Sequence, residues 1–159
     1  MIITYEQHKA LLMEACMDNT AAVDCLMCIF QCYRVWDNIW DGDKENSKQA
    51  VDKAFSDMAF ELTRNSFYVQ HQAVIVANIA VSWNAWQDSN EWANHDDKFK
   101  RGSAWYIRDY CNEIVPLFAW IIGGKDHMRS VSLKIREAYL NYSVESDNGL
   151  FFFDTNDQK

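Results

Sequence analysis

The sequence contains few of the residues that interrupt helices. It has one proline and five glycines among 159 residues, too few for the many turns that an all-β chain of this length requires. Apolar residues make up 49% of the chain and aromatic residues 14%, which is enough for a hydrophobic core. A chain of this length is expected to form one domain. The composition therefore predicts an all-α fold, with a single helical domain over residues 1–159.

Positive charge is also scarce. The chain has 15 lysines and arginines against 23 aspartates and glutamates, for a formal net charge of -8. Its one basic cluster, formed by Lys98, Lys100 and Arg101, directly follows Asp96 and Asp97. Because a negatively charged protein is repelled by a phosphate backbone, we expect no nucleic-acid partner.

Long apolar runs are missing as well. No run reaches the roughly 20 residues that a membrane-spanning helix needs. The first residues, MIITYEQHKALLMEA, lack the basic segment followed by an apolar segment that marks a secretory signal. We therefore expect no membrane partner and no secretion through a signal peptide.

Five cysteines, an odd number, cannot all pair within one chain. Cys25, Cys28 and Cys32 have a spacing that also occurs in metal sites. Helical periodicity, however, places them on one stripe with Ile29 and Trp36, the most apolar side of that helix. Structural zinc usually takes ligands from turns. We expect free, buried cysteines without a bound metal, and hence a reducing compartment.

Apolar periodicity and capping residues predict a bundle of about six helices with a short apolar tail. The expected helices lie at about residues 4–18, 20–41, 47–65, 67–86, 99–122 and 126–143. The expected N-caps are Thr4 and Ser47, and Gly42 and Gly123 with Gly124 are expected to end helices. Residues 88–98 predict a loop.

The fifth helix and the tail carry two further predictions. Pro116 has no backbone N–H to donate, so a bend is expected near it. Residues 150–153, LFFF, are expected either to dock on the bundle or to contact a partner.

Three helices show an apolar side at helical spacing. These sides are expected to form the core, and they contain Leu26, Ile29, Cys32, Trp36 and Trp40 in the second helix, Val51, Phe55, Met58 and Leu62 in the third, and Met128, Val131, Ile135, Ala138 and Tyr142 in the last.

A group of charges lies at the edge of the apolar side of the second helix. Arg34, Asp37 and Asp41 follow one another at spacings of three and four, which makes them neighbours on a helix. Carboxylates beside aromatic surface are partly desolvated and need a partner. Arg34 is one candidate, and Arg108 in the fifth helix is another. We expect these four residues to form a structural charge cluster.

A metal site is the alternative interpretation of the same aspartates. Asp109 and Glu113 are also four residues apart, so two carboxylate pairs on two helices would provide oxygen ligands for Mg²⁺ or Mn²⁺. Asp37-x-x-x-Asp41 resembles the aspartate-rich motif of isoprenoid-diphosphate synthases. Those enzymes are much longer and carry two such motifs with basic residues for the diphosphate, whereas here the stretches are DNIWD and DYCNE. Ion pairs are far commoner than such sites, so the charge cluster is favoured.

The histidines provide a second resemblance to an enzyme family. His71, then His95 with Asp96, then Asp126 is similar in order to the metal ligands of HD phosphohydrolases, which are all-helical. Here His95 and Asp96 lie in the polar stretch NHDDK, which predicts a surface loop. The chain also lacks a nucleophile elbow, a glycine-rich phosphate loop and an HExxH motif. No catalytic or cofactor-binding residue is therefore assigned.

Four stretches together resemble small all-helical proteins encoded by tailed bacteriophages. They are WDNIWDGDK, LTRNSFYVQH, WYIRDYCNEIV and GGKDH, and the resemblance covers residues 30–128. That group has no known activity. The resemblance implies a phage protein in the cytoplasm of an infected bacterium, either packed into the virion or acting on the host.

The chain as a whole favours a binding role. An acidic, aromatic-rich bundle without a catalytic constellation is typical of a protein-interaction module. We expect it to need no cofactor and to bind a phage or host protein, and possibly a second copy of itself. The alternative is a small Mg²⁺- or Mn²⁺-dependent enzyme of diphosphate or phosphohydrolase type that uses Asp37, Asp41, Asp109 and Glu113.

Overall fold

A computed structural model describes residues 5–42 and 47–146, with side chains up to residue 139. These residues are all-α, and no strand occurs among them. The helices are α1 (Tyr5–Ala15), α2 (Thr20–Asp41), α3 (Lys48–Ser56), α4 (Leu62–Arg64), α5 (Ser66–Ala93), α6 (Lys98–Arg108) and α7 (Ile114–Ser146). A π-helical turn, η1 (Asp57–Glu61), joins α3 to α4, and a 3₁₀ turn, η2 (Asp109–Glu113), joins α6 to α7.

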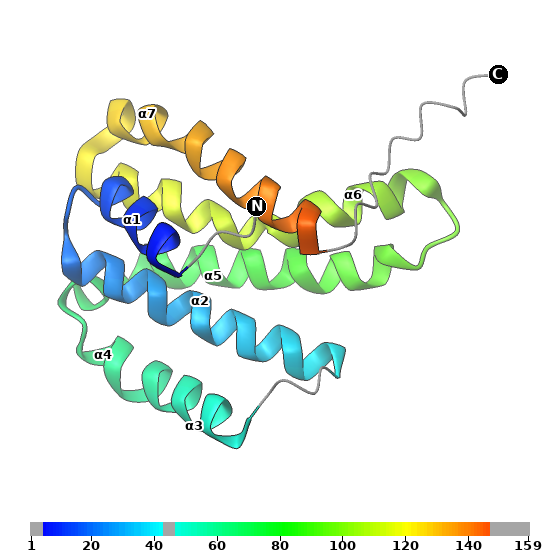
Figure 1. The fold of residues 1–159 in the computed structure, drawn as a ribbon, viewed down its shortest axis with the longest axis horizontal. Coiled ribbons are helices and arrows are strands. Elements are labelled where there is room, and N and C mark those ends of the chain that lie inside the picture. The colour runs from blue at the N-terminus through cyan, green and yellow to red at the C-terminus, as the bar shows by residue number, and fades with distance from the viewer. Residues whose placement is uncertain (1–4, 43–46, 147–159) are drawn as a thin grey trace.

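The described residues form five continuous helical segments, one fewer than the six predicted. One segment runs from α3 through η1 into α4, and another from α6 through η2 into α7. The predicted end at Gly123 and Gly124 lies within α7, where Gly124 has φ 73° and ψ -169°. Figure 1 shows the two arms of α7 folding back on each other. One left-handed glycine reverses the chain here, so no separate loop is needed.

The predicted bounds of the second helix are confirmed in α2. Its N-cap is Asn19, whose side-chain oxygen accepts a hydrogen bond from the Ala22 N–H at 3.1 Å. Gly42 ends it in a left-handed conformation with φ 73°. Ser47 caps α3 as predicted, and its hydroxyl accepts from the Ala50 N–H at 3.1 Å. The predicted cap Thr4 and the apolar tail lie outside the described residues.

The predicted loop at residues 88–98 is wrong for its first half, because α5 continues to Ala93. Ser89 is buried, and its hydroxyl donates to the Trp86 carbonyl at 2.6 Å. A serine hydroxyl that donates to a carbonyl in the preceding helical turn can be buried within a helix. The polar residues of this stretch therefore do not mark a loop.

The N-terminal end of α5 is fixed by Asn65. Asn65 caps α5 and donates from Nδ2 to the Ala21 carbonyl at 2.8 Å, which fixes the start of α5 against α2.

A bend was predicted near Pro116, and the structure shows a 3₁₀ turn, η2, one turn before it. The proline ring crowds the carbonyl four residues before it, which belongs to Asn112, and Pro116 cannot donate to that carbonyl. The strain therefore falls on the preceding turn, which takes 3₁₀ geometry. Arg108 is therefore the last residue of α6 before the helix changes to 3₁₀ geometry.

The helices pack around α2 and α5, which run parallel (Figure 1). α3 lies on the outer side of α2, α6 packs along α5, and α1 packs on both α2 and α7. The core is formed by side chains from these helices, and its largest fully buried members are Phe118, Leu12, Leu26, Ile75, Ile114 and Ile135.

Part of the predicted core is exposed. Leu26, Ile29, Leu62, Val131 and Ile135 are buried as predicted. The exposed ones are Trp36, Trp40, Val51, Phe55 and Met58. Periodicity shows which residues share a side of a helix, whereas tertiary packing decides whether another helix covers that side. The predictions for these five residues were therefore wrong.

Candidate functional site

Four tryptophans form a cluster where α2 and α5 meet. Trp36 and Trp40 come from α2 and Trp83 and Trp86 from α5, at spacings of four and three that put each pair on one side of its helix. The ring centroids of Trp36 and Trp83 are 4.8 Å apart, and those of Trp40 and Trp86 are 5.4 Å apart. These are normal distances for packed aromatic pairs. We call these four residues the tryptophan cluster.

The α2 side of the tryptophan cluster faces solvent. Trp36 is 39% exposed and Trp40 57% exposed, and their neighbour Ile39 is also exposed. Trp83 and Trp86 are half-buried beneath them. Tryptophan is among the residues that contribute most to binding energy when a partner covers them.

A network of charged groups supports the cluster from the side. Asp37 Oδ1 accepts a hydrogen bond from Trp86 Nε1 at 2.9 Å and another from Arg108 Nη2 at 3.0 Å. Arg108 Nη2 also donates to Asp41 Oδ2 at 3.1 Å. The network links α2, α5 and α6, and it fixes the ring of Trp86. Hydrogen bonds to a charged carboxylate are stronger than neutral ones.

The structure brings together three of the four residues in the predicted charge cluster. Asp37, Asp41 and Arg108 are in contact, and their side chains are between 32% and 41% exposed. Arg34 has an exposed side chain on α2 and takes no part in these bonds. The two aspartates are thus held by an arginine from another helix rather than by the one within α2.

The carboxylates of the alternative metal site are separated by arginines. Arg136 from α7 binds Glu113 through two bonds, Nε to Oε1 at 2.9 Å and Nη2 to Oε2 at 2.5 Å. Arg108 lies between Asp37 and Asp41. In the described part of the chain, no three histidine, cysteine, aspartate or glutamate side chains are placed to hold a metal ion. The structure therefore does not bring Asp37, Asp41, Asp109 and Glu113 into one site.

The histidine and aspartate residues that resemble those of HD phosphohydrolases form no metal-binding group in the described part of the chain. His71 lies in α5 beside Phe67, at ring centroids 4.6 Å apart. His95 is in the loop before α6, where its Nδ1 accepts from the Asp97 N–H at 3.0 Å. Asp126 lies in α7, just after the reversal at Gly124. His95 therefore serves to order a surface loop.

The sequence interpretation missed Trp83 and Trp86. Both fall in a helix so rich in apolar residues that no single side stands out. Trp83 and Trp86 are three residues apart, and Trp36 and Trp40 are four apart. These spacings place each pair on one side of its helix and could have indicated a cluster. They become informative only once α2 and α5 are known to be neighbours.

Cys25, Cys28 and Cys32 lie in α2, and all five cysteines have free thiols, as predicted. Cys25 is buried, and burial raises its pKa to about 12. Cys28 and Cys32 are only half-buried, where α3 crosses α2, and the Cys32 thiol donates to the Ala54 carbonyl at 3.4 Å. A hydrogen bond from Cys28 lowers the pKa of Cys32.

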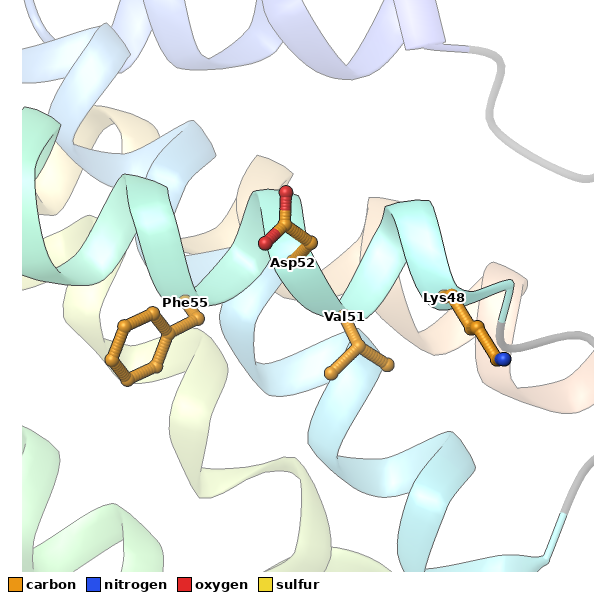
Figure 2. Close-up of a pocket in the computed structure, with 4 residues that line it drawn as sticks. All are labelled: Lys48, Val51, Asp52 and Phe55. Carbon is orange, nitrogen blue, oxygen red and sulfur yellow. The ribbon is translucent and has the colours of Figure 1, made fainter.

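A second apolar surface lies on α3. Val51, Phe55 and Met58 are exposed along one side of α3 and its continuation η1. Figure 2 shows Val51 and Phe55 on the same side, with Lys48 beside Val51 and with Asp52 pointing away from that side. These residues line a shallow pocket. Only Ala54 of α3 is buried, so this helix turns its larger apolar residues outward.

Comparison with known proteins finds no matching family model, no similar curated protein and no similar solved structure. None of the helices in the described part of the chain is long and apolar enough to cross a membrane. The proposal for function therefore rests on the geometry of the exposed surfaces.

Proposed function

We propose that this protein is an interaction module that binds a partner protein through the tryptophan cluster. The observation that carries the proposal is a group of four packed indole rings, of which Trp36 and Trp40 are exposed and Trp86 is held by a charge network. Water-exposed Trp36 and Trp40 together offer a large apolar area. Apolar area contributes to the free energy of binding only when a partner removes it from water.

The charge network makes the tryptophan cluster suited to binding. Asp37 holds the indole N–H of Trp86, and Trp40 packs against the ring of Trp86. Side chains that are already ordered lose little conformational entropy when a partner arrives. The supported rings therefore retain more of the interaction energy than flexible side chains would.

The resemblance to phage proteins suggests in which compartment the partner is found. A phage-encoded module would meet phage or host proteins in the cytoplasm of an infected bacterium, or other proteins of the virion. A magnesium- or manganese-dependent enzyme has weaker support, because Arg108 and Arg136 occupy three of its four carboxylates.

Binding by matched tryptophan variants tests the proposal. Wild type, Trp40→Ala and Trp120→Ala would be used to capture proteins from the source cells, and the captured partner would be titrated against each by calorimetry. Trp120 is the control, because it is 50% exposed on α7, outside the cluster. We expect Trp40→Ala to weaken binding at least about tenfold, as truncation of a central tryptophan does, and Trp120→Ala to leave it unchanged. Equal affinities of wild type and Trp40→Ala would contradict the proposal.

A further inference from the structure

The middle of α5 carries no charge. Between Arg64 and Asp88 the sequence has no aspartate, glutamate, lysine or arginine. Helices that face water on one side normally carry charged residues there, whereas the exposed polar residues of this stretch, such as Gln72 and Asn84, are uncharged. Figure 1 shows α5 running along the length of the bundle beside α2.

One side of α5 nevertheless faces solvent. After the kink at His71, Val76 is 44% exposed and Val81 60% exposed. Helical spacing places exposed alanines on the same side. Because α5 is kinked at His71, only residues after the kink are counted together. We call this side the α5 face, and it consists of Ala73, Val76, Ala77, Ala80 and Val81.

We propose that the α5 face is the contact between two copies of this chain. This inference is independent of the function proposed for the tryptophan cluster, since it concerns a different set of residues. A two-fold axis would place the α5 face of one copy against the same face of the other. Ala77 lies near the middle of the face and would be close to the axis.

The lack of charge favours a second copy as the occupant. A lysine or aspartate from any partner would be buried against the α5 face without a counter-charge, which is costly. The partner must therefore present an uncharged surface, and the α5 face itself meets that requirement. The net charge of -8 on each copy opposes their association, so the contact has to be made where each chain is neutral.

The shape of the α5 face also fits a pair of helices. Ala73, Ala77 and Ala80 have small side chains, which let two helix axes approach to the lower end of the usual range of about 8–10 Å. From Ala73 to Gln87 α5 is about 21 Å long, at 1.5 Å per residue. A standard interface buries about 800 Å² on each partner. One side of a single helix supplies less area than this. Val74, which is exposed beside the α5 face, extends the contact, and the dimer is expected to have moderate affinity.

Sedimentation velocity on the full chain tests the inference. The wild type, at about 1–100 μM, is expected to shift from a mass of 18.6 kDa to twice that value. Ala77→Glu places a carboxylate at the middle of the α5 face, and its dissociation constant should rise about 100-fold or more. Leu133→Glu is the matched control, because it adds the same charge at an exposed apolar residue of α7, and it should dimerise like the wild type.

Mixing opposite charges tests whether the contact is between copies. Ala77→Glu and Ala77→Lys should each be monomeric alone and should form a mixed dimer when combined. A wild type that stays monomeric at all concentrations overturns the inference, whether another protein or residues 147–159 cover α5. A dimer that survives in Ala77→Glu also overturns it. If circular dichroism shows that Ala77→Glu is misfolded, Ala73→Glu takes its place. Unchanged capture of the Trp40-dependent partner by Ala77→Glu would separate this contact from the tryptophan cluster.

Discussion

Asp37 is the residue on which the candidate site converges, since it accepts hydrogen bonds from side chains on two other helices. Asp37→Asn keeps an acceptor oxygen but removes the charge that holds Arg108. Because both side chains are about a third or more exposed, water screens the pair, and we expect a loss of about 0.5–1.5 kcal/mol in unfolding free energy. Urea denaturation of the purified variant would measure it.

Asp41→Asn is the matched control for this change. Asp41 makes one bond to Arg108, so its substitution should cost less than that of Asp37. A double-mutant cycle of Asp37→Asn with Arg108→Met should show coupling. A metal site makes the opposite prediction, because carboxylates crowded without a cation repel each other. An Asp37→Asn protein that is more stable than wild type without metal, and that no longer responds to magnesium or manganese, would contradict the charge-network interpretation.

Sequence periodicity went far in locating these residues. It placed Asp37 and Asp41 at the edge of the apolar side of α2 and named Arg108 among the candidate partners. It left the choice between Arg34 and Arg108 open, because that choice depends on how α6 packs near α2. The same limit explains Trp36, whose place on the apolar side was correct and whose burial was not.

At the scale of elements, the reversal within α7 depends on Gly123. A Cβ added there would lie 2.6 Å from the Cβ of His127, whose Nε2 donates to the Ala15 carbonyl at 2.9 Å and so holds α1 on α7. Gly123→Ala must displace His127 and weaken this hydrogen bond. We expect a loss of about 1–3 kcal/mol in unfolding free energy, measured by thermal melting.

Gly102→Ala is the opposite case and serves as the control. Gly102 lies inside α6, and an added Cβ would meet nothing within 4 Å. Because alanine is a better helix former than glycine, this variant should gain about 0.5–1 kcal/mol. A Gly123→Ala protein as stable as the wild type would show that the reversal tolerates a side chain.

The contact between α1 and the second arm of α7 should depend on pH. His8 Nε2 and the Tyr139 hydroxyl share a hydrogen bond of 2.8 Å, and burial lowers the pKa of His8 from its ordinary value of 6.5. The unfolded chain therefore binds this proton more readily than the folded chain does. The contribution of neutral His8 to stability is complete above pH 6.5 and is lost as the pH falls below that value toward the pKa in the folded state.

Comparison with His8→Gln isolates this contribution, because glutamine does not titrate and can still hydrogen-bond to Tyr139. The melting temperature of the wild type relative to His8→Gln should be constant above pH 7 and should fall between pH 6.5 and pH 5. A difference that does not change with pH would mean that His8 titrates normally in the folded protein.

Other elements show where sequence patterns stop being informative. The end of α2 at Gly42 and the N-cap of α3 at Ser47 were predicted correctly, because capping depends on residues close together in the sequence. The continuation of α5 to Ala93 was missed, since burial of Ser89 arises from packing against another helix. A bend was predicted near Pro116, whereas the structure has a 3₁₀ turn, η2, one turn earlier, because proline strains the residues before it.

On the scale of the whole molecule, charge and apolar surface are separated. The chain carries a net charge of -8, while the tryptophan cluster and the α5 face present apolar side chains to water. Net charge keeps copies apart and favours solubility, and an uncharged face is where that repulsion is weakest. Composition alone predicted the acidic and aromatic character, but it could not show that the uncharged residues gather on one exposed side of α5.

This separation predicts how salt affects self-association. Two copies at -8 each give a dimer at -16 (2 × -8), so repulsion opposes the contact through α5 and is screened as ionic strength rises. Raising NaCl from about 20 mM to about 300 mM should therefore lower the dissociation constant of the dimer several-fold. Sedimentation equilibrium at the two salt concentrations measures the change, and Leu133→Glu, with one more negative charge per copy, should show a larger change than the wild type. A dissociation constant that rises with salt would mean that ion pairs cross the interface, and the uncharged α5 face would then not be the contact.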